Sequence, residues 1–445
     1  MAIQLPASPA SPLLKKLIGR ALDAVQAGAA LRRAVRKQGD VLVIGTRRYD
    51  LRRYERIVVI GAGKATASMA CALEPLLGSR LQSGFVIVKY GHAVPTKRVV
   101  VAEAGHPLPD RAGLYAARRL MRVASSLSKR DLLIVLLSGG ASSLMPAPAP
   151  GISLHDKLRV TQRLLKSGAS IREINTVRKH LSALKGGRLA ESTDATIVTL
   201  ILSDVLGDDV SSIASGPTVP DPTTYAEAIE CLKRYRLWAG LPSGIRRHLS
   251  GGLRRLVGET PKPGAALFRR AHHHVIGNGA LAVAATARAA REAGLMTVVH
   301  STTLTGEAGP AGARLGAMAA GILRRGKPAR RPCCIVAGGE TTVTVRGKGR
   351  GGRAQEFAVA AAKVIAGMRH VWVAAVGTDG TDGPTDVAGA VVDGGTLSRA
   401  KQMGVDLDAA LKKNNTYPAL KKLRAHIKTG PTGTNVNDLY LLLML

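Results

Sequence analysis

The chain has 445 residues, which is too long for one ordinary hydrophobic core and therefore predicts two domains. Hydrophobic residues make up 46% of the chain, so the composition is that of a folded globular protein and excludes an intrinsically disordered one. The formal net charge is +34, which favours anionic partners but does not say whether they are nucleic acids or small molecules.

In the first half of the chain, short apolar runs that end in glycine alternate with helical patterns. A buried strand over 56–64 enters a glycine turn and is followed by a helix over about 65–77. The runs 84–91, 131–143 and 195–209 repeat the layout of a strand followed by glycine or polar residues. This rhythm predicts an α/β fold with a parallel, doubly wound, Rossmann-like sheet, in which ligands bind at the carboxyl ends of the strands.

After about Gly240 the composition changes, and a stretch rich in glycine, proline and arginine resembles a connection between domains. Beyond it, 272–294 predicts another strand, turn and helix, and strands are expected within 333–345 and 370–383. We therefore expect an N-terminal Rossmann-like domain over 1–245 and a C-terminal α/β domain over 246–445.

The run Gly61-Ala62-Gly63-Lys64 follows the first strand and opens a helix. It begins like a dinucleotide fingerprint, but Thr66 stands where the third glycine belongs; nor is it a Walker A loop, because Val58 occupies the first required glycine. The amides of a helix N-terminus beside a lysine still make a good anion site. The alternative is a tight turn with an exposed lysine.

The most apolar strand ends in Ser138-Gly139-Gly140-Ala141-Ser142-Ser143. Glycines allow backbone amides to point toward a ligand, and hydroxyls add donors, so this loop suits a carboxylate or phosphate. It does not meet the GxSxG pattern of a nucleophile elbow. A plain Ser/Gly turn is the alternative interpretation.

The segment 173–188 predicts a helix that ends at a Gly-Gly stop, with an apolar face and a cationic face. Lys185 and Arg188 bracket the two glycines and are candidates for contacts with phosphate. Ordinary surface amphipathicity would explain the same pattern.

Acidic residues number only 30, so their clusters are informative. Asp204 and Asp208 follow one predicted strand, and Asp379 and Asp382 follow another within GTDGTDGPTD. Carboxylates on glycine-bounded turns could hold Mg²⁺, or one could take a proton from an alcohol. Turns without ligands are the alternative, and the spacing does not fit a calcium-binding loop.

Two further glycine-rich strings contain Glu340, Arg353 and Glu356. A guanidinium at Arg353, held after two glycines, could clamp phosphoryl oxygens in a bidentate manner. The triplet His272-His273-His274 invites a metal assignment, but alternate side chains of a strand face opposite ways, so we interpret it as structural.

Eight strings together resemble the glycerate 2-kinase family, whose C-terminal part is called the MOFRL domain. They run in order from about residue 56 to residue 439: GAGKA, LSGGASSL, EINTVRKHLSALKGGRLA, LILSDVLGDDVSSIASGPT, GGETTV, GRGGRAQE, GTDGTDGPTD and GPTGTNVNDL. The family usually has Asn where this chain has Ala354. Members have often carried a hydroxypyruvate reductase label, which the broken dinucleotide fingerprint does not support.

The resemblance implies two α/β domains with the active site in the cleft between them. It also implies transfer of the ATP γ-phosphoryl group to the 2-hydroxyl of D-glycerate, with Mg²⁺, to give 2-phosphoglycerate. Lys64 and Arg353 match the family's catalytic lysine and arginine. Our remaining assignments follow by role: Asp204 as catalytic; Ser138, Gly139, Gly140, Ser142, Ser143, Lys185, Arg188, Glu340 and Glu356 for substrate or phosphate; Gly61, Gly63, Gly277, Asn278 and Asp379 for nucleotide; Asp208 and Asp382 for metal.

Two other functions stay open from the sequence: an NAD(P)H-dependent hydroxypyruvate reductase and a basic nucleic-acid-binding protein. The four cysteines form no CxxC pair, and neither a signal-peptide layout nor a membrane-length apolar run is present, so we expect a cytoplasmic protein without a membrane partner. We further expect no specific nucleic-acid partner, and a homo-oligomer is possible.

Overall fold

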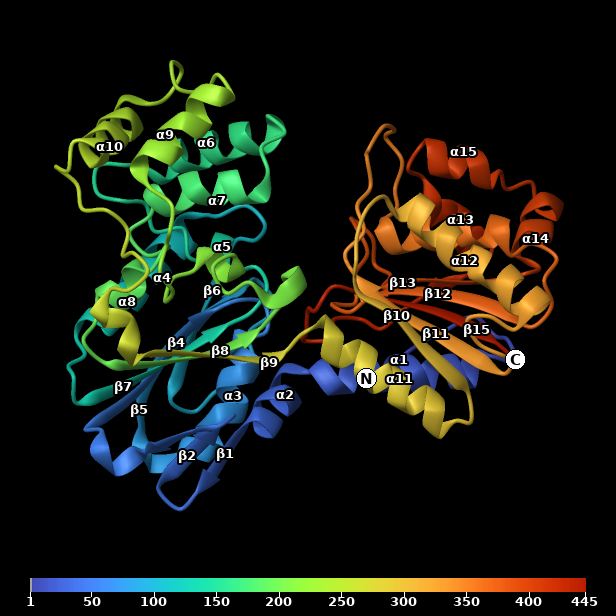
Figure 1. The fold of residues 1–445 in the computed structure, drawn as a ribbon, viewed down its shortest axis with the longest axis horizontal. Coiled ribbons are helices and arrows are strands. Elements are labelled where there is room, and N and C mark those ends of the chain that lie inside the picture. Colours follow the sequence, from blue (N-terminus) through green and yellow to red (C-terminus); the bar gives the residue numbers. More distant parts are fainter. Residues whose placement is uncertain (1) are drawn as a thin grey trace. The chain divides into compact units, whose positions relative to one another are not determined.

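The computed structural model describes residues 2–445 and forms two compact units (Figure 1). The inserted unit is continuous and spans residues 27–276, whereas the terminal unit joins the residues up to Gln26 to residues 277–445. This division differs from the expected domains 1–245 and 246–445 at both ends of the inserted unit.

Buried apolar side chains explain both differences. Helix α1 (Ser11–Val25) buries Leu14, Leu17 and Leu22 and packs on α11 (Gly279–Glu292), so the N-terminal segment belongs to the terminal unit. The expected boundary at residue 245 falls inside a helix, which explains why no division occurs there. That helix is α10 (Ser243–Leu253), which the composition had indicated as a linker and which buries Leu249.

The inserted unit contains a six-stranded sheet in the order β6-β5-β4-β7-β8-β9, with parallel pairing from β6 through β8. Its strands are β4 (Arg56–Ala62), β5 (Leu81–Lys89), β6 (Val99–Ala104), β7 (Asp131–Leu137), β8 (Thr196–Leu202) and β9 (Ala271–Gly277). Every residue of β7 is buried, as a strand covered on both faces requires. The prediction of a parallel α/β sheet is confirmed.

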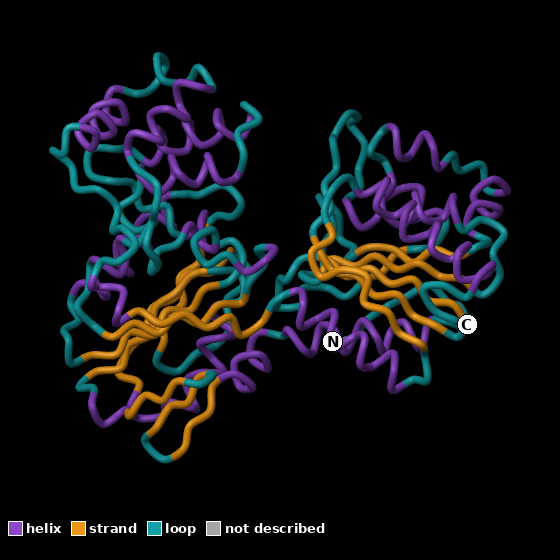
Figure 2. The backbone as a smooth tube through the Cα atoms, in the orientation of Figure 1, coloured by secondary structure: helices purple, strands orange, loops and turns teal. Residues whose placement is uncertain are grey.

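Several elements of the inserted unit were not predicted. The strands β1 (Val35–Gln38), β2 (Val41–Ile44) and β3 (Arg47–Asp50) form a small antiparallel sheet. A helical layer, which Figure 2 shows apart from the large sheet, has its own hydrophobic core and comprises α6 (Leu154–Lys166), α7 (Ile171–His180), α9 (Tyr225–Arg234) and α10. Helix α3 (Thr66–Leu77) confirms the helix predicted over about 65–77, and the remaining helices are α2 (Ala27–Ala34), α4 (Arg111–Ser125), α5 (Ala141–Leu144) and α8 (Arg188–Glu191).

The helix predicted over 173–188 is shorter than expected. Helix α7 starts after the capping box that Ser170 and Glu173 form, and it ends at His180. Beyond it, Ser182 pairs with Pro148 in a β-bridge and its hydroxyl donates to the Ala147 carbonyl (3.0 Å), which draws the chain out of the helical path.

The terminal unit contains a mixed sheet in the order β10-β11-β15-β12-β13-β14, in which β15 runs antiparallel to both of its neighbours. Its strands are β10 (Met296–Leu304), β11 (Cys333–Gly339), β12 (Val371–Gly377), β13 (Gly389–Asp393), β14 (His426–Ile427) and β15 (Asp438–Met444). Helices α12 (Ala308–Arg325) and α13 (Arg353–Val364) cover one face, and α1 and α11 cover the other (Figure 1).

Shorter elements complete the chain. They are α14 (Thr396–Gln402), α15 (Leu407–Lys412) and α16 (Thr416–Lys422), with 3₁₀ turns η1 (Leu51–Arg53), η2 (Gly78–Arg80), η3 (Leu206–Asp208), η4 (Ile213–Ser215) and η5 (Ala266–Arg270). Among residues 2–445, no helix combines the length and apolarity needed to cross a bilayer.

Candidate functional site

Two glycine turns of the inserted unit pack together at the carboxyl ends of the neighbouring strands β4 and β7. The Lys64 amide donates to the Gly139 carbonyl (2.9 Å). A Cβ atom at Gly63 would lie 2.1 Å from the Ser138 hydroxyl oxygen, and one at Gly61 would lie 2.2 Å from a carbonyl of β7. These glycines are therefore required by the packing of one turn on the other, which explains the incomplete dinucleotide fingerprint.

Lys64 extends along the 138–143 loop. A Cβ atom at Gly140 would lie 3.6 Å from Lys64 Cγ and 2.8 Å from the His106 ring, and Gly140 has a left-handed φ of 87°. The structure thus brings together the predicted lysine and the predicted anion-binding loop, although they are far apart in the sequence.

The serine hydroxyls of this loop have different roles. The Ser138 hydroxyl oxygen accepts from the Ala65 amide (3.0 Å), and the Ser143 hydroxyl donates to a carbonyl of its own loop (3.0 Å). The Ser142 hydroxyl instead reaches the Ser215 hydroxyl in η4 (2.9 Å). Two of the three predicted donors therefore hold the loop in shape.

Buried cations gather behind the loop. Lys185 is 1% exposed and donates to the carbonyls of Ser142 (3.0 Å) and Ala214 (3.2 Å). Burial, together with the charges of Arg178 and Lys157, holds the pKa of Lys185 well below its usual value. Such an arrangement suits an anionic ligand.

Arg188 points elsewhere. Its guanidinium donates to the Gly258 carbonyl (2.8 Å) and the Tyr225 hydroxyl (3.3 Å). The structure therefore does not place its guanidinium with the 138–143 loop, and its assignment to phosphate stays a prediction.

The acidic residues after β8 lie on two turns. Asp204 follows β8, which neighbours β7, and so stands at the same edge of the sheet as the Lys64 turn. Asp208 lies in η3 with a φ of 54°. Its neighbour Asp209 accepts from the amide and hydroxyl of Ser211, so Asp209 shapes the turn.

The predicted strings of the terminal unit converge on a cavity of about 640 Å³. Arg353, the first residue of α13, donates from Nε to Asp438 Oδ2 (2.7 Å) and from Nη2 to Asp438 Oδ1 (3.1 Å). Its Nη1 donates to Glu340 Oε1 (2.5 Å). Three of the five guanidinium N–H groups are thus used for positioning, and two remain for a ligand.

Burial and charge oppose each other in this arrangement. Burial alone would lower the pKa of Arg353, but the two carboxylates outweigh it and raise that pKa. Burial raises the pKa of Asp438, which is 4% exposed, to about 7, although the hydrogen-bonded Arg353 acts against the rise.

Asp438 was not assigned to the site from the sequence, and neither were Arg178 and Lys157. The signal that could have indicated Asp438 was a scarce acid just before an apolar run.

The cavity is rich in carboxylates. Arg353 is its only cationic lining side chain within the described chain, against five acids: Glu340, Glu356, Asp379, Asp382 and Asp438. In a protein of net charge +34 this excess is unusual, and it suits a cation that carries an anionic ligand. Among residues 2–445, no group of three or more His, Cys, Asp or Glu side chains is arranged to hold a metal ion by itself.

The predicted acids of this cavity differ in their bonding. The Asp382 carboxylate accepts from the amides of Ala354 (3.0 Å) and Gln355 (2.9 Å) and so caps α13. Glu356 accepts from the Asn414 side chain (2.9 Å), and burial raises the pKa of Glu356. Asp379 accepts from the amide and hydroxyl of Thr381 (3.0 Å each) and lines the cavity.

Two predicted nucleotide contacts lie where the chain passes from one unit to the other. Gly277 ends β9, and the Asn278 side chain caps α11 by accepting from the Leu281 amide (2.9 Å). Ala354, where the family usually has Asn, is fully buried in the hydrophobic core of the terminal unit.

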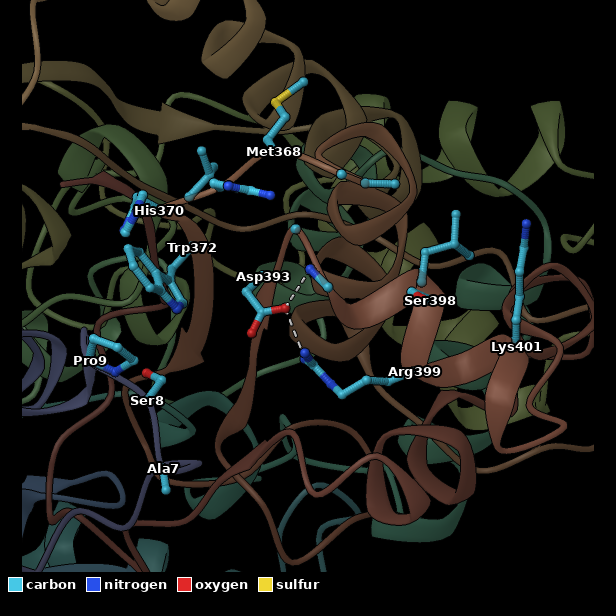
Figure 3. A pocket seen from close by; sticks show the side chains of 17 residues that line it. Ala7, Ser8, Pro9, Met368, His370, Trp372, Asp393, Ser398, Arg399 and Lys401 are labelled. Carbon is cyan, nitrogen blue, oxygen red and sulfur yellow. Dashed lines mark hydrogen bonds and ion pairs between the residues drawn. The ribbon is translucent and has the colours of Figure 1, made fainter.

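A second hollow of the terminal unit lies at the opposite end of β12 (Figure 3). Its volume is about 950 Å³, and Pro9, Trp372 and Arg399 line it. Asp393 accepts from Arg399 (2.8 Å) and from the Gly395 amide (2.8 Å). No predicted site residue lines this hollow, whereas Glu340, Arg353, Glu356, Asp379 and Asp382 line the Arg353 cavity.

Comparisons with known proteins show the family to which the chain is similar. Residues 13–250 match the domain of unknown function DUF4147, and residues 333–438 match the MOFRL family. The chain is 41% identical to glycerate 2-kinase from Pyrococcus horikoshii (96% of this chain, 95% of that protein). It is 43% identical to D-glycerate 2-kinase from Thermotoga maritima (87% and 90%). A relative from Agrobacterium vitis, also 43% identical over 87% of each chain, carries a hydroxypyruvate reductase name.

A crystal structure of glycerate kinase from Thermotoga maritima matches with a TM-score of 0.86 and 38% identity, covering 98% of this chain and 100% of that one. The fold is thus that of a two-domain α/β protein with a MOFRL domain. The chain belongs to the glycerate 2-kinase family, which confirms the resemblance read from the sequence.

Proposed function

We propose that this chain is an ATP-dependent glycerate 2-kinase, which phosphorylates the 2-hydroxyl of D-glycerate and releases ADP and 2-phosphoglycerate. The observation that carries the proposal is the match over 96% of the chain to a relative named glycerate 2-kinase. The charge pattern supports it, because one unit has a cation-lined loop and the other a carboxylate-lined cavity.

In the reaction, the 2-hydroxyl oxygen bonds to the γ-phosphorus, the bond from that phosphorus to the bridging oxygen breaks, and the hydroxyl proton passes to a base. We assign Lys64 and Arg353 to neutralising the charge of the moving phosphoryl group, since phosphoryl transfer depends mainly on positioning and electrostatics. Asp204, at the same sheet edge as Lys64, is our candidate for orienting the hydroxyl and accepting its proton.

The carboxylate excess of the Arg353 cavity fits Mg²⁺, which binds in proteins through one or two carboxylates together with phosphate oxygens. Asp379 and Glu340 would hold it, because both line the cavity and neither is buried. When bound, Mg²⁺ would supply positive charge to the phosphate oxygens of ATP. Asp382 is a weaker candidate, since its carboxylate already accepts from the Ala354 and Gln355 amides. Asp208 does not line this cavity.

The test is ADP release by the purified chain with ATP, Mg²⁺ and D-glycerate, with the product identified as 2-phosphoglycerate. Lys64→Ala should lower the rate at least about 10³-fold, whereas Lys97→Ala, at an exposed lysine of the same unit, should leave it within about twofold. Normal turnover of Lys64→Ala would remove Lys64 from the site. NADH oxidation on hydroxypyruvate without kinase activity would instead favour the reductase.

A further inference from the structure

Two buried lysines and one half-buried arginine of the inserted unit lie close together without a counter-ion. Lys185 is 1% exposed, Lys157 is 5% exposed, and the guanidinium of Arg178 lies close enough to lower the pKa of both. Within residues 2–445, none of the three forms an ion pair with a carboxylate. In this part of the chain, Lys157 Nζ donates only to the Ala147 carbonyl (3.1 Å). Burial lowers the pKa of both lysines because no negative group of the described chain offsets it, so a bound anion would stabilise their charged forms.

The cluster is connected to the surface through the 138–143 loop. Lys185 Nζ donates to the Ser142 carbonyl, the Ser142 hydroxyl contacts Ser215, and the Ser215 hydroxyl donates to Asn175 Oδ1 (3.4 Å). Ser215 is fully buried and Asn175 is 7% exposed, whereas Ser142 and Arg178 are half-buried. We call the buried groups the floor of the cluster and the half-buried groups, Ser142 and Arg178, its rim.

We infer that this floor and rim bind the carboxylate group of the hydroxy-acid substrate, with Arg178 as the main donor. The inference rests on the proposed kinase function and names the substrate group that this unit recognises. Arg178 makes one long hydrogen bond, to Asn175 Oδ1 (3.5 Å), so most of its five N–H groups remain for a planar carboxylate. A polyphosphate that carries Mg²⁺ fits less well here, because no carboxylate joins the cluster to share the metal.

The two buried lysines should also couple binding of the carboxylate to uptake of protons. Burial, reinforced by Arg178, lowers the pKa of Lys157 to about 7. A bound carboxylate favours the charged ammonium forms, so binding at about pH 8 should be accompanied by uptake of protons. Calorimetric titration of the full chain with D-glycerate, in two buffers of different ionisation enthalpy, measures that uptake directly.

The first test compares Arg178→Gln with Arg172→Gln, which changes an exposed arginine on the same helix. Arg178→Gln should raise KM for D-glycerate more than about tenfold and leave KM for ATP unchanged, because a hydrogen bond to a charged group is lost. Arg172→Gln should change neither. An unchanged KM for D-glycerate in Arg178→Gln would overturn the inference.

The second test, Asn175→Asp, keeps the size of the side chain and supplies the missing charge from within the protein. Both hydrogen bonds at Asn175 are accepted by Oδ1, so an aspartate retains them. The thermal midpoint should rise while affinity for D-glycerate falls more than about tenfold, since the internal carboxylate competes with the ligand. Affinity equal to that of the unchanged protein would refute the site, whatever happens to stability.

The two proposals fail in distinguishable ways. Calorimetry without ATP reports binding of D-glycerate, with glycerol, which has no carboxylate, as the control ligand. Carboxylate binding that depends on Arg178, in a chain that makes no 2-phosphoglycerate, would reject the kinase and retain this site. Kinase activity in Arg178→Gln with an unchanged KM for D-glycerate would retain the kinase and reject this site.

Discussion

At the scale of single residues, the clearest feature is that Arg353 is held from two sides. Asp438 receives two of its N–H groups in a bidentate pair, and Glu340 receives a third. Such a fork fixes both the position and the orientation of the guanidinium, which a lysine cannot reproduce.

We therefore expect Arg353→Lys to lower kcat about 10³-fold or more, although the positive charge is kept, because the oriented donors are lost. Steady-state kinetics with ATP and D-glycerate would measure the loss. The matched control is Arg350→Lys, in the same glycine-rich loop, where the arginine is exposed and stacks on Tyr417. If the lysine variant kept a tenth or more of the activity, orientation of the guanidinium would not matter.

At the scale of elements, the Asp382 carboxylate acts as a cap of α13 rather than as a ready metal ligand. The amides of Ala354 and Gln355 would lose their acceptor in Asp382→Ala, and Gln355 Nε2 would lose a third bond (3.0 Å). These groups are buried, so the loss is not compensated by water.

We predict that Asp382→Ala lowers the free energy of unfolding by about 1–3 kcal/mol. The Mg²⁺ concentration for half-maximal activity should not change. Asp386→Ala, at an exposed acid of the same string, should cost less than about 1 kcal/mol and serves as the control. Denaturant unfolding and a Mg²⁺ titration of activity check the two statements, and a large shift in the Mg²⁺ titration would restore Asp382 as a ligand.

The helices and strands also show how much of the fold could be predicted from the sequence. Strands covered on both faces, such as β7, are continuous apolar runs and were recognised, together with the glycine turns at their ends. The charged strands β1 and β3 have no such signature. Strand β15 was not predicted, because nothing local indicates that this apolar run pairs between β11 and β12.

The same topology explains the site residues that were missed. Pairing places Asp438 opposite Gly339 and Gly377, and so beside Arg353, 85 residues away in the sequence. Lys157 was missed, and Arg178 was recognised only as part of the cationic face of the helix predicted over 173–188. The reason is related: α6 and α7 pack in a helical layer whose existence depends on non-local contacts. Residue types and spacing indicate candidates, whereas pairing order decides which of them meet.

At the scale of the whole molecule, the chain is one unit inserted into another. Helix α1 closes one face of the terminal sheet together with α11, yet more than 250 residues separate the two helices. Its five large buried apolar residues (Leu14, Leu17, Ile18, Leu22 and Val25) contribute roughly 10 kcal/mol by burial, which is comparable to the whole stability of a domain. The terminal unit therefore depends on both ends of the chain.

This organisation predicts the behaviour of fragments. Residues 27–276 contain all strands of their sheets and their own cores, so this fragment should unfold cooperatively and give a dispersed amide spectrum. Residues 246–445 should not, since they lack α1 and begin inside α10. Each unit carries one tryptophan, Trp238 or Trp372, so tryptophan fluorescence reports the unfolding of each unit separately.

Adding a peptide of residues 2–26 to the fragment 277–445 should restore a cooperative unfolding transition, because the peptide supplies the missing helix α1. A cooperative transition in 246–445 without that peptide would show that α1 is dispensable and that the division at residue 245 is physically sound.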